Sequence, residues 1–175
     1  MSNKILWCDL ETTGLDPING KILEISALVT DNKFNELASF SQVIGWEHKE
    51  IVPLMNEFCL KMHIESGLLS DIANSTTTFR LATLDFAKFI HDNFGDEKPS
   101  LAGNTISFDK NFIKFQMPEV DKLLHHRLVD VSGMAVGLEL FMDLTVQRPL
   151  VKHRGQSDIL ASIELTKRIV SILSK

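Results

Sequence analysis

Three strand-like segments joined by short, turn-prone connections constrain the fold of this chain most strongly. Residues 4–11, 22–30 and 36–44 have the pattern of β-strands. Between them lie DPING at 16–20 and DNKFN at 31–35, both rich in residues that favour turns. Connections this short favour antiparallel neighbours, because a parallel pair needs a crossover of about a dozen residues or more. The first part of the chain therefore predicts an antiparallel meander.

The rest of the chain alternates helices with short strands. Residues 79–94 show the clearest helical periodicity, with apolar side chains recurring at 3.6-residue spacing. Strands are predicted at 100–103 and 127–131, each followed by a helix, the first of which starts near Ser107. A last helix is predicted from about residue 156 to 173. This order of elements indicates an α/β or α+β domain with a mixed sheet.

Length and composition narrow the class of protein. At 175 residues the chain suits one domain, residues 1–175, with a sizeable core. No apolar run approaches the ~18 residues that span a bilayer, so we expect no membrane partner. We interpret Cys8 and Cys59 as reduced thiols of a cytoplasmic protein, because two cysteines make no disulfide framework. A net charge of −5 argues against tight, metal-free binding of long nucleic acid, but allows a short anionic substrate held by a metal.

An acid pair interrupts the first apolar strand. Asp9 and Glu11 are two residues apart, and side chains at i and i+2 of a strand point to the same face. Carboxylates this close repel each other, so one of them takes up a proton unless a cation bridges the pair. The alternative is that both acids lie at a frayed strand end and face water.

Two later helices also open with an acid. Asp109 lies in the first turn of the helix that starts near Ser107. Asp158 lies in the first turn of the last helix, five residues after His153, which we place in a loop. Each acid alone is explained by the favourable interaction of a carboxylate with a helix N-terminus. That explanation does not account for the joint pattern of an acid pair on the first strand and acids at two later helices.

The joint pattern resembles the DEDDh family of 3′-to-5′ exonucleases. The family's first motif corresponds to DLETTGLD at 9–16, the second to residues 104–109, and the third to His153 with Asp158. Further stretches resemble the oligoribonuclease group of this family, in the same order: ILEISALVTD, HIESGLL, LAGNTISFDKNF, QMPEVDKLLHHRLVDVS and HRGQSDI. The resemblance implies an α/β fold of the ribonuclease-H-like type, with a mixed sheet flanked by helices.

The resemblance also implies a catalytic centre with two divalent cations, Mg²⁺ or Mn²⁺. The family's metal ligands correspond to Asp9, Glu11, Asp109 and Asp158. Hard cations prefer carboxylate oxygen and water, and two of them about 4 Å apart clamp the attacking and leaving oxygens of a phosphodiester. His153 would be the general base that takes a proton from the attacking water.

Other residues correspond to the family's substrate contacts. Leu15 matches a leucine that wedges between two bases, and Phe58 stands where the family has a tryptophan that stacks on a base. His63 matches a histidine near the substrate phosphate, with a surface histidine as the alternative. Ser107, next to the turn of Asp109, is either a substrate contact or a helix N-cap.

Arg127 and Ser132 match a pair that, in the family, comes from the partner subunit and caps the 5′ phosphate of a two-nucleotide substrate. Arginine suits this role because its guanidinium binds phosphate oxygens bidentately. The resemblance therefore implies a homodimer. The alternative for Arg127 is a surface ion pair at a strand edge.

Some positions depart from the family pattern. Thr12 replaces a common methionine, Ser157 replaces a second acid, and His126 replaces a tyrosine before the cap arginine. Residues 137–152 resemble the family poorly. These departures bear on the length of the substrate more than on catalysis.

Three functions from two classes follow. The first is hydrolysis of short single-stranded RNA, down to two nucleotides, to mononucleotides. The second is a DEDDh exonuclease acting on single-stranded DNA in proofreading or repair, a wider group that Thr12 resembles. The third is a non-catalytic scaffold with the same fold. The acidic cluster disfavours the scaffold, because carboxylates without a metal only repel one another.

Overall fold

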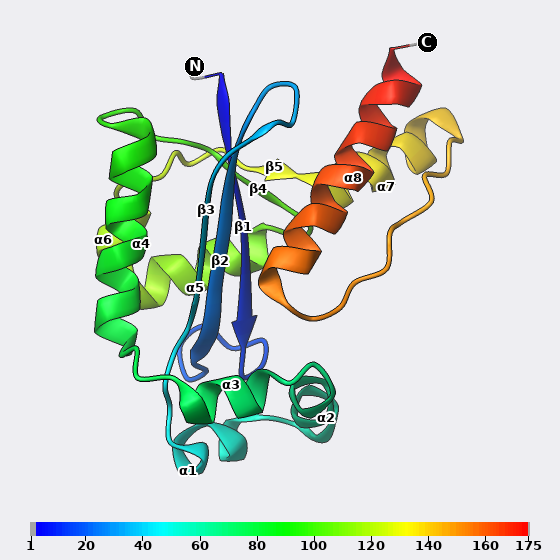
Figure 1. Ribbon diagram of the computed structural model, residues 1–175. Helices are drawn as coiled ribbons and strands as arrows, with labels where there is room; N and C mark the ends of the chain where they lie inside the picture. Colours follow the sequence, from blue (N-terminus) through cyan, green and yellow to red (C-terminus); the bar gives the residue numbers. More distant parts are fainter. Residues whose placement is uncertain (1–2, 175) are drawn as a thin grey trace.

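The first three strands form the predicted antiparallel meander. A computed structural model describes residues 3–174 and shows these strands at the centre of the molecule (Figure 1). They are β1 (Lys4–Thr12), β2 (Ile22–Asp31) and β3 (Glu36–Val43). β2 pairs antiparallel with both β1 and β3, so the short connections have the effect expected from the sequence.

Two short parallel strands complete a mixed sheet. β4 (Leu101–Gly103) pairs with β1, and β5 (Val129–Asp130) pairs with β4, which gives the order β3-β2-β1-β4-β5. β5 is shorter than the predicted 127–131, because helix α7 begins directly after it at Val131. The mixed sheet with flanking helices confirms the predicted fold class.

The helices follow the sequence pattern closely. The helix predicted at 79–94 has those bounds, and the last helix begins one residue earlier than predicted. Within residues 3–174, no helix combines the length and the hydrophobicity needed to cross a bilayer. The helical elements are α1 (His48–Ile51), a 3₁₀ turn (Val52–Leu54), α2 (Glu57–Glu65), α3 (Leu68–Asn74), α4 (Phe79–Phe94), α5 (Ser107–Gln116), α6 (Pro118–Asp121), α7 (Val131–Met142) and α8 (Gly155–Leu173).

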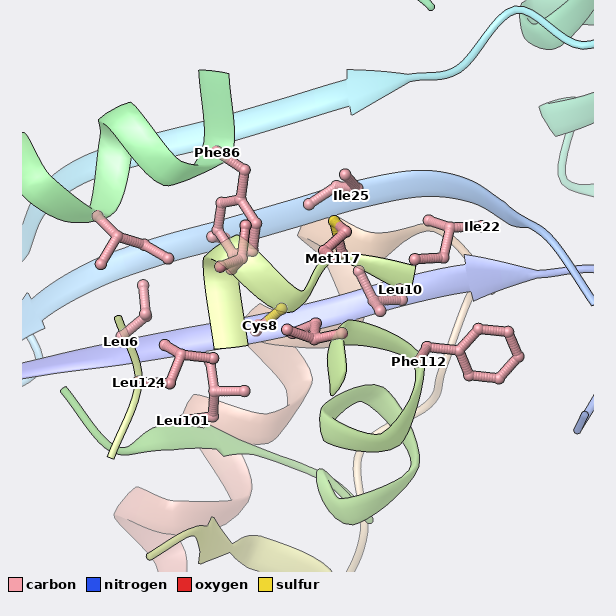
Figure 2. Close-up of a cluster of buried hydrophobic side chains, with 14 of the residues drawn as sticks. Leu6, Cys8, Leu10, Ile22, Ile25, Phe86, Leu101, Phe112, Met117 and Leu124 are labelled. Atoms are coloured by element: carbon pink, nitrogen blue, oxygen red, sulfur yellow. The ribbon is translucent and has the colours of Figure 1, made fainter. Parts of the chain in front are cut away.

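One face of the sheet carries the larger hydrophobic core. Leu6, Cys8 and Leu10 of β1 point to this face, where they pack with Phe86 of α4 and Phe112 of α5 (Figure 2). All of these side chains are buried. Burial of apolar area at about 25 cal/mol per Å² is the main term that holds α4 and α5 against the sheet.

The opposite face of the sheet is covered by α8. Trp7 of β1 packs there with Ile159 of α8, and α4 and α8 lie on opposite sides of the sheet in Figure 1. Since strand side chains alternate, Asp9 and Glu11 share this second face with Trp7. The fold therefore directs the acid pair toward the helix whose first turn carries Asp158.

Candidate active site

The acid pair of β1 meets the acid of α8. One ligand atom from each of Asp9, Glu11 and Asp158 lies within 4.8 Å of the others, so the three carboxylates can share a cation. Glu11 and Asp158 are buried, and β1 continues to Thr12. The alternative of a frayed, water-facing strand end is therefore wrong.

Asp109 joins this group from α5. Its Oδ1 accepts a 2.8 Å hydrogen bond from the backbone N–H of Leu10, and its side chain is buried. A single pocket of about 300 Å³ is lined by the carboxylates of β1, α5 and α8 and by His153. The structure thus brings together all of the predicted metal-binding and catalytic residues: Asp9, Glu11, Asp109, His153 and Asp158.

The carboxylate of Asp158 also fixes the loop that carries His153. Its Oδ1 accepts a hydrogen bond from the Lys152 N–H at 2.7 Å, and its Oδ2 accepts one from the His153 N–H at 3.0 Å. His153 has φ of 54°, in the left-handed region that a non-glycine residue rarely adopts. The two hydrogen bonds hold the backbone in this strained conformation at the mouth of the pocket.

Burial and mutual repulsion keep protons on this cluster in the metal-free protein. Burial, with the charges of Asp158 and Glu24, raises the pKa of Asp9 to about 7. Burial and the neighbouring carboxylates raise the pKa of Glu11 to about 9, and burial also raises the pKa of Asp109 well above its usual value. The converging carboxylates carry excess negative charge, and a carboxylate donor set fits hard divalent cations such as Mg²⁺ or Mn²⁺.

The two expected base contacts each line a pocket that His153 also lines. Leu15 is 85% exposed and lines the carboxylate pocket. Phe58, on α2, is 73% exposed and lines a second pocket of about 350 Å³, which also includes Val151 and His153. Because His153 lines both pockets, the two pockets are neighbours.

His63 lies beneath the site rather than on its surface. Its side chain is fully buried, and Nε2 lies 2.9 Å from the carbonyl oxygen of Thr12. Its Nδ1 lies 3.9 Å from Glu11 Oε2, which is too long for a hydrogen bond. Burial lowers the pKa of His63. The surface-histidine alternative is wrong, and in this structure His63 is buried beside Glu11.

The two serines lie near the carboxylate pocket. Ser107 is exposed and is the first residue of α5; Ile106 occupies the N-cap position, so the N-cap alternative is wrong. The hydroxyl of Ser132 lies 3.2 Å from Thr105 Oγ1 and 3.3 Å from Asn104 Oδ1. Asn104 and Thr105 line the pocket, so these contacts connect Ser132 to two residues beside the carboxylates.

Arg127 is exposed in the segment before β5. Among the residues that the structure describes, no salt bridge involves Arg127, so the surface-ion-pair alternative has no support in this chain. Its backbone N–H donates a 3.0 Å hydrogen bond to Nδ1 of His125. The guanidinium is therefore available to an anion that approaches from outside the chain.

Comparison with known proteins identifies the family. A sequence model described as "Exonuclease" matches residues 6–166, which includes the acid pair, Asp109 and Asp158. This chain belongs to the exonuclease family. Within it, the chain is 32% identical to an oligoribonuclease of Francisella tularensis subsp. novicida over 93% of this chain and 91% of the relative. It is 36% identical to a mitochondrial oligoribonuclease of Mus musculus, over 75% of this chain and 56% of the relative.

Solved structures of another exonuclease share the fold. Escherichia coli exonuclease I, in the metal-free form of its complex with single-stranded DNA, matches with a TM-score of 0.68 and 15% identity, over 97% of this chain. The zinc-bound form of that complex matches with a TM-score of 0.67. The matched region covers only about two fifths of the length of those exonuclease I chains, 40% and 42% respectively. These structural matches support the predicted ribonuclease-H-like fold. The assignment to the DEDDh exonucleases, in the oligoribonuclease group, rests on the sequence matches.

Sequence reasoning missed two charged residues next to the site of this exonuclease. Glu24 lies directly across β1–β2 from Glu11, and its side chain is 4% exposed. Arg154 follows His153, and its Nε lies 3.2 Å from Glu24 Oε2. One signal was present in the sequence: Glu24 interrupts an apolar strand, as Asp9 and Glu11 do. Its partner is not deducible from local pattern, because the two residues are 130 positions apart.

Proposed function

We propose that this exonuclease degrades short single-stranded RNA from its 3′ end, down to two nucleotides, and releases mononucleotides. The observation that carries the proposal is the convergence of the acids of β1, α5 and α8 with His153 on one pocket. The relatives named oligoribonuclease support RNA as the substrate.

The carboxylates of Asp9, Glu11, Asp109 and Asp158 would hold two divalent cations, Mg²⁺ or Mn²⁺. Bound there, such cations neutralise the phosphate and stabilise the charge that develops on the attacking and leaving oxygens. His153 would accept the proton of the attacking water as general base, a role that histidine fills more often than any other side chain. Asp158 supports that step by fixing the His153 backbone through its own hydrogen bond.

The two subsites fit a short substrate. Ligand pockets are typically about 300–1,000 Å³, and the pockets beside Leu15 and Phe58 measure about 300 and 350 Å³. Leu15 would insert between two bases, and Phe58 would stack on one of them with less area than a tryptophan. Ser107 and His63 would support the phosphate-binding part of the site, His63 from beneath through Thr12.

A homodimer would supply the remaining end of the site. Arg127 and Ser132 of one subunit would cap the 5′ phosphate of a substrate bound to the other, which would limit substrate length. An exposed apolar surface supports a dimer: α7, which begins one residue before Ser132, presents large apolar side chains to solvent. These are Val136, Leu140, Phe141 and Met142. A surface of this kind is expected to be covered by a protein partner.

The domain organisation and the compartment of the protein are also proposed. Residues 1–175 would act as one exonuclease domain. The cytoplasm is its proposed compartment, because Cys8 and Cys59 are both free and buried.

A length series tests the proposed function. The purified protein, with Mn²⁺, is given labelled RNA of two, five and twenty nucleotides and DNA of the same lengths. The proposal predicts mononucleotide products and fastest turnover on the shortest RNA. Faster hydrolysis of the DNA series would support the single-stranded DNA alternative. No hydrolysis of either series by a folded protein that still binds Mn²⁺ would support the scaffold.

A further inference from the structure

The guanidinium of Arg154 connects three separate parts of the chain beside the site. Its Nε lies 3.2 Å from Glu24 Oε2 on β2, and its Nη1 lies 2.7 Å from Asp71 Oδ2 on α3. Nη1 also donates to the carbonyl oxygen of Ser66 at 3.4 Å, where α2 ends. Arginine is suited to this because its planar guanidinium presents several donors in fixed directions.

Glu24 makes a cation at this position necessary. It is buried, and it shares the sheet face of Glu11, directly across the strand pair. A buried carboxylate is costly unless a positive group meets it, and the neighbouring acids add repulsion. Arg154 is the residue whose charge meets Glu24 among the residues that the structure describes.

The start of α8 is fixed to the sheet without the help of Arg154. Gly155 packs so closely on β2 that an added Cβ would lie 2.5 Å from Ser26 Cβ. Gln156 Nε2 donates to the carbonyl oxygen of Phe40 at 2.8 Å. Neither contact reaches α2 or α3. What Arg154 adds is therefore the connection from the start of α8 to the α2–α3 corner.

That corner forms one wall of the second subsite. The pocket beside Phe58 is lined on one side by α2 up to Ser66 and on the other by residues 151–153. Arg154 lies next to His153 in sequence and contacts Ser66, so it joins the two walls. α2 is also held to β1, because His63 and Cys59 both contact the carbonyl oxygen of Thr12. Loss of the Arg154 contact would therefore free the end of α2 at Ser66 to move relative to the His153 wall.

We propose that Arg154 is a positioning residue that fixes the distance between the Phe58 subsite and His153. A base stacked on Phe58 would then place the scissile phosphate of the substrate next to the proton acceptor His153. The inference rests on the proposed function and deepens it. Displacement of a reacting group by about 1 Å can slow a reaction by about 10²-fold.

Four variants test this role by steady-state kinetics. Arg154→Met should lower kcat by about 10²-fold with a smaller change in KM. Arg154→Lys should lower kcat less, because one ammonium keeps a single contact. Asp71→Asn, which leaves Glu24 and Arg154 paired, should lower kcat without destabilising the core. Arg80→Met is the matched control, since Arg80 is exposed in the first turn of α4, on the opposite side of the sheet from α8; its kcat should stay within about twofold of the parent.

A double variant separates positioning from stability. Arg154→Met leaves Glu24 buried and unpaired, so its melting temperature should fall. Adding Glu24→Gln removes that charge and should restore the melting temperature, while kcat stays low compared with Glu24→Gln alone. Recovery of kcat together with the melting temperature would overturn the inference and leave Arg154 a merely stabilising residue.

Amide hydrogen exchange tests the connection without any substrate. The N–H groups of Lys152 and His153 donate to Asp158, and their exchange should be about tenfold faster in Arg154→Met than in Arg80→Met. Equal exchange in the two variants would overturn the inference whatever the substrate. Faster exchange in a protein that cleaves neither RNA nor DNA would refute the proposed function while supporting the connection made by Arg154.

Discussion

The backbone N–H of Leu10 donates a 2.8 Å hydrogen bond to Oδ1 of Asp109, 99 residues later in the chain. Leu10 stands between Asp9 and Glu11, so this bond fixes the carboxylate of α5 beside the acid pair of β1. The bond is buried, and a buried N–H that loses its acceptor costs about 1–3 kcal/mol. Asp109 therefore stabilises the fold in addition to its proposed role as a metal ligand.

Substitutions of the carboxylates should have two different effects on the stability of the metal-free protein. Asp9→Asn and Glu11→Gln should keep or raise the melting temperature, because each removes one of several mutually repelling groups. Asp109→Ala should lower the free energy of unfolding by about 1–3 kcal/mol, since the Leu10 N–H loses its acceptor. All three should lose most hydrolytic activity. Thermal unfolding in chelator measures the first effect; unfolded Asp9→Asn and Glu11→Gln proteins would show that the acid pair is structural.

Stability of the metal-free protein should fall as pH rises. The pKa of Asp9 is raised from 3.8 to about 7, and that of Glu11 from 4.5 to about 9. The folded protein therefore holds protons that the unfolded chain has released. This contribution is complete below about pH 4 and is lost as pH rises through about 7 and then about 9.

Urea unfolding between pH 5 and 9, with and without Mn²⁺, measures this dependence. Mn²⁺ should stabilise the protein increasingly as pH rises, because it binds the ionised carboxylates. Glu11→Gln should flatten the upper part of the metal-free curve. Metal-free stability that rises steadily from pH 5 to 9 would contradict the shifted values.

His153→Ala should slow hydrolysis by about 10²–10⁴-fold, the usual contribution of general acid–base catalysis. Affinity for Mn²⁺ should change little, because His153 is not among the proposed ligands. His91→Ala, on the exposed side of α4, is the matched control and should behave as the parent protein. Single-turnover rates and calorimetric titration with Mn²⁺ provide the two readouts, and near-normal turnover of His153→Ala would place the base elsewhere.

Phe58→Ala should weaken binding of short RNA by about 1–3 kcal/mol, the range for loss of one stacked base. Phe58→Trp should bind at least as tightly as the parent, because indole offers a larger stacking surface. Phe115→Ala removes another exposed phenylalanine, on α5, and serves as control. Fluorescence anisotropy of a labelled dinucleotide in Ca²⁺ reports the affinity. Equal affinities for Phe58→Ala and the parent would remove Phe58 from the substrate site.

Arg127→Ala should impair two-nucleotide substrates much more than longer ones. A hydrogen bond to a charged group contributes about 1.5–3 kcal/mol, and a short substrate has few other contacts to compensate. Arg148→Ala is the control, since Arg148 is also exposed. Analytical ultracentrifugation should show a dimer, with activity on the dinucleotide falling on dilution. A fully active monomer would exclude a cap supplied by the partner subunit.

Local patterns explain how much of the fold was predictable. The three strands and the helix at 79–94 are specified by turn residues and apolar periodicity within each segment, and the structure has them there. β5 was predicted too long, because its two residues are defined by pairing with β4 rather than by their own sequence. The last helix starts at Gly155, which packs closely on Ser26, and local sequence does not report such a contact.

The candidate site was predictable where the family motif marks it. The carboxylates and His153 were assigned from the resemblance, and they do converge on one pocket. The burial of His63 and the Arg154–Glu24 ion pair were not predictable, because both depend on which segments the fold brings together. His63 contacts Thr12, 51 positions away, and no local pattern reports such a contact.

If the carboxylate cluster is a two-metal hydrolytic centre, hydrolysis of a dinucleotide must depend on bound metal. The rate is measured on labelled two-nucleotide RNA while Mn²⁺ is titrated into metal-free protein, alongside calorimetric counting of bound ions. A two-metal centre should show no hydrolysis in excess chelator and recovery of the rate when Mn²⁺ is added, with about two ions bound per chain at saturation. Full activity in excess chelator would contradict it.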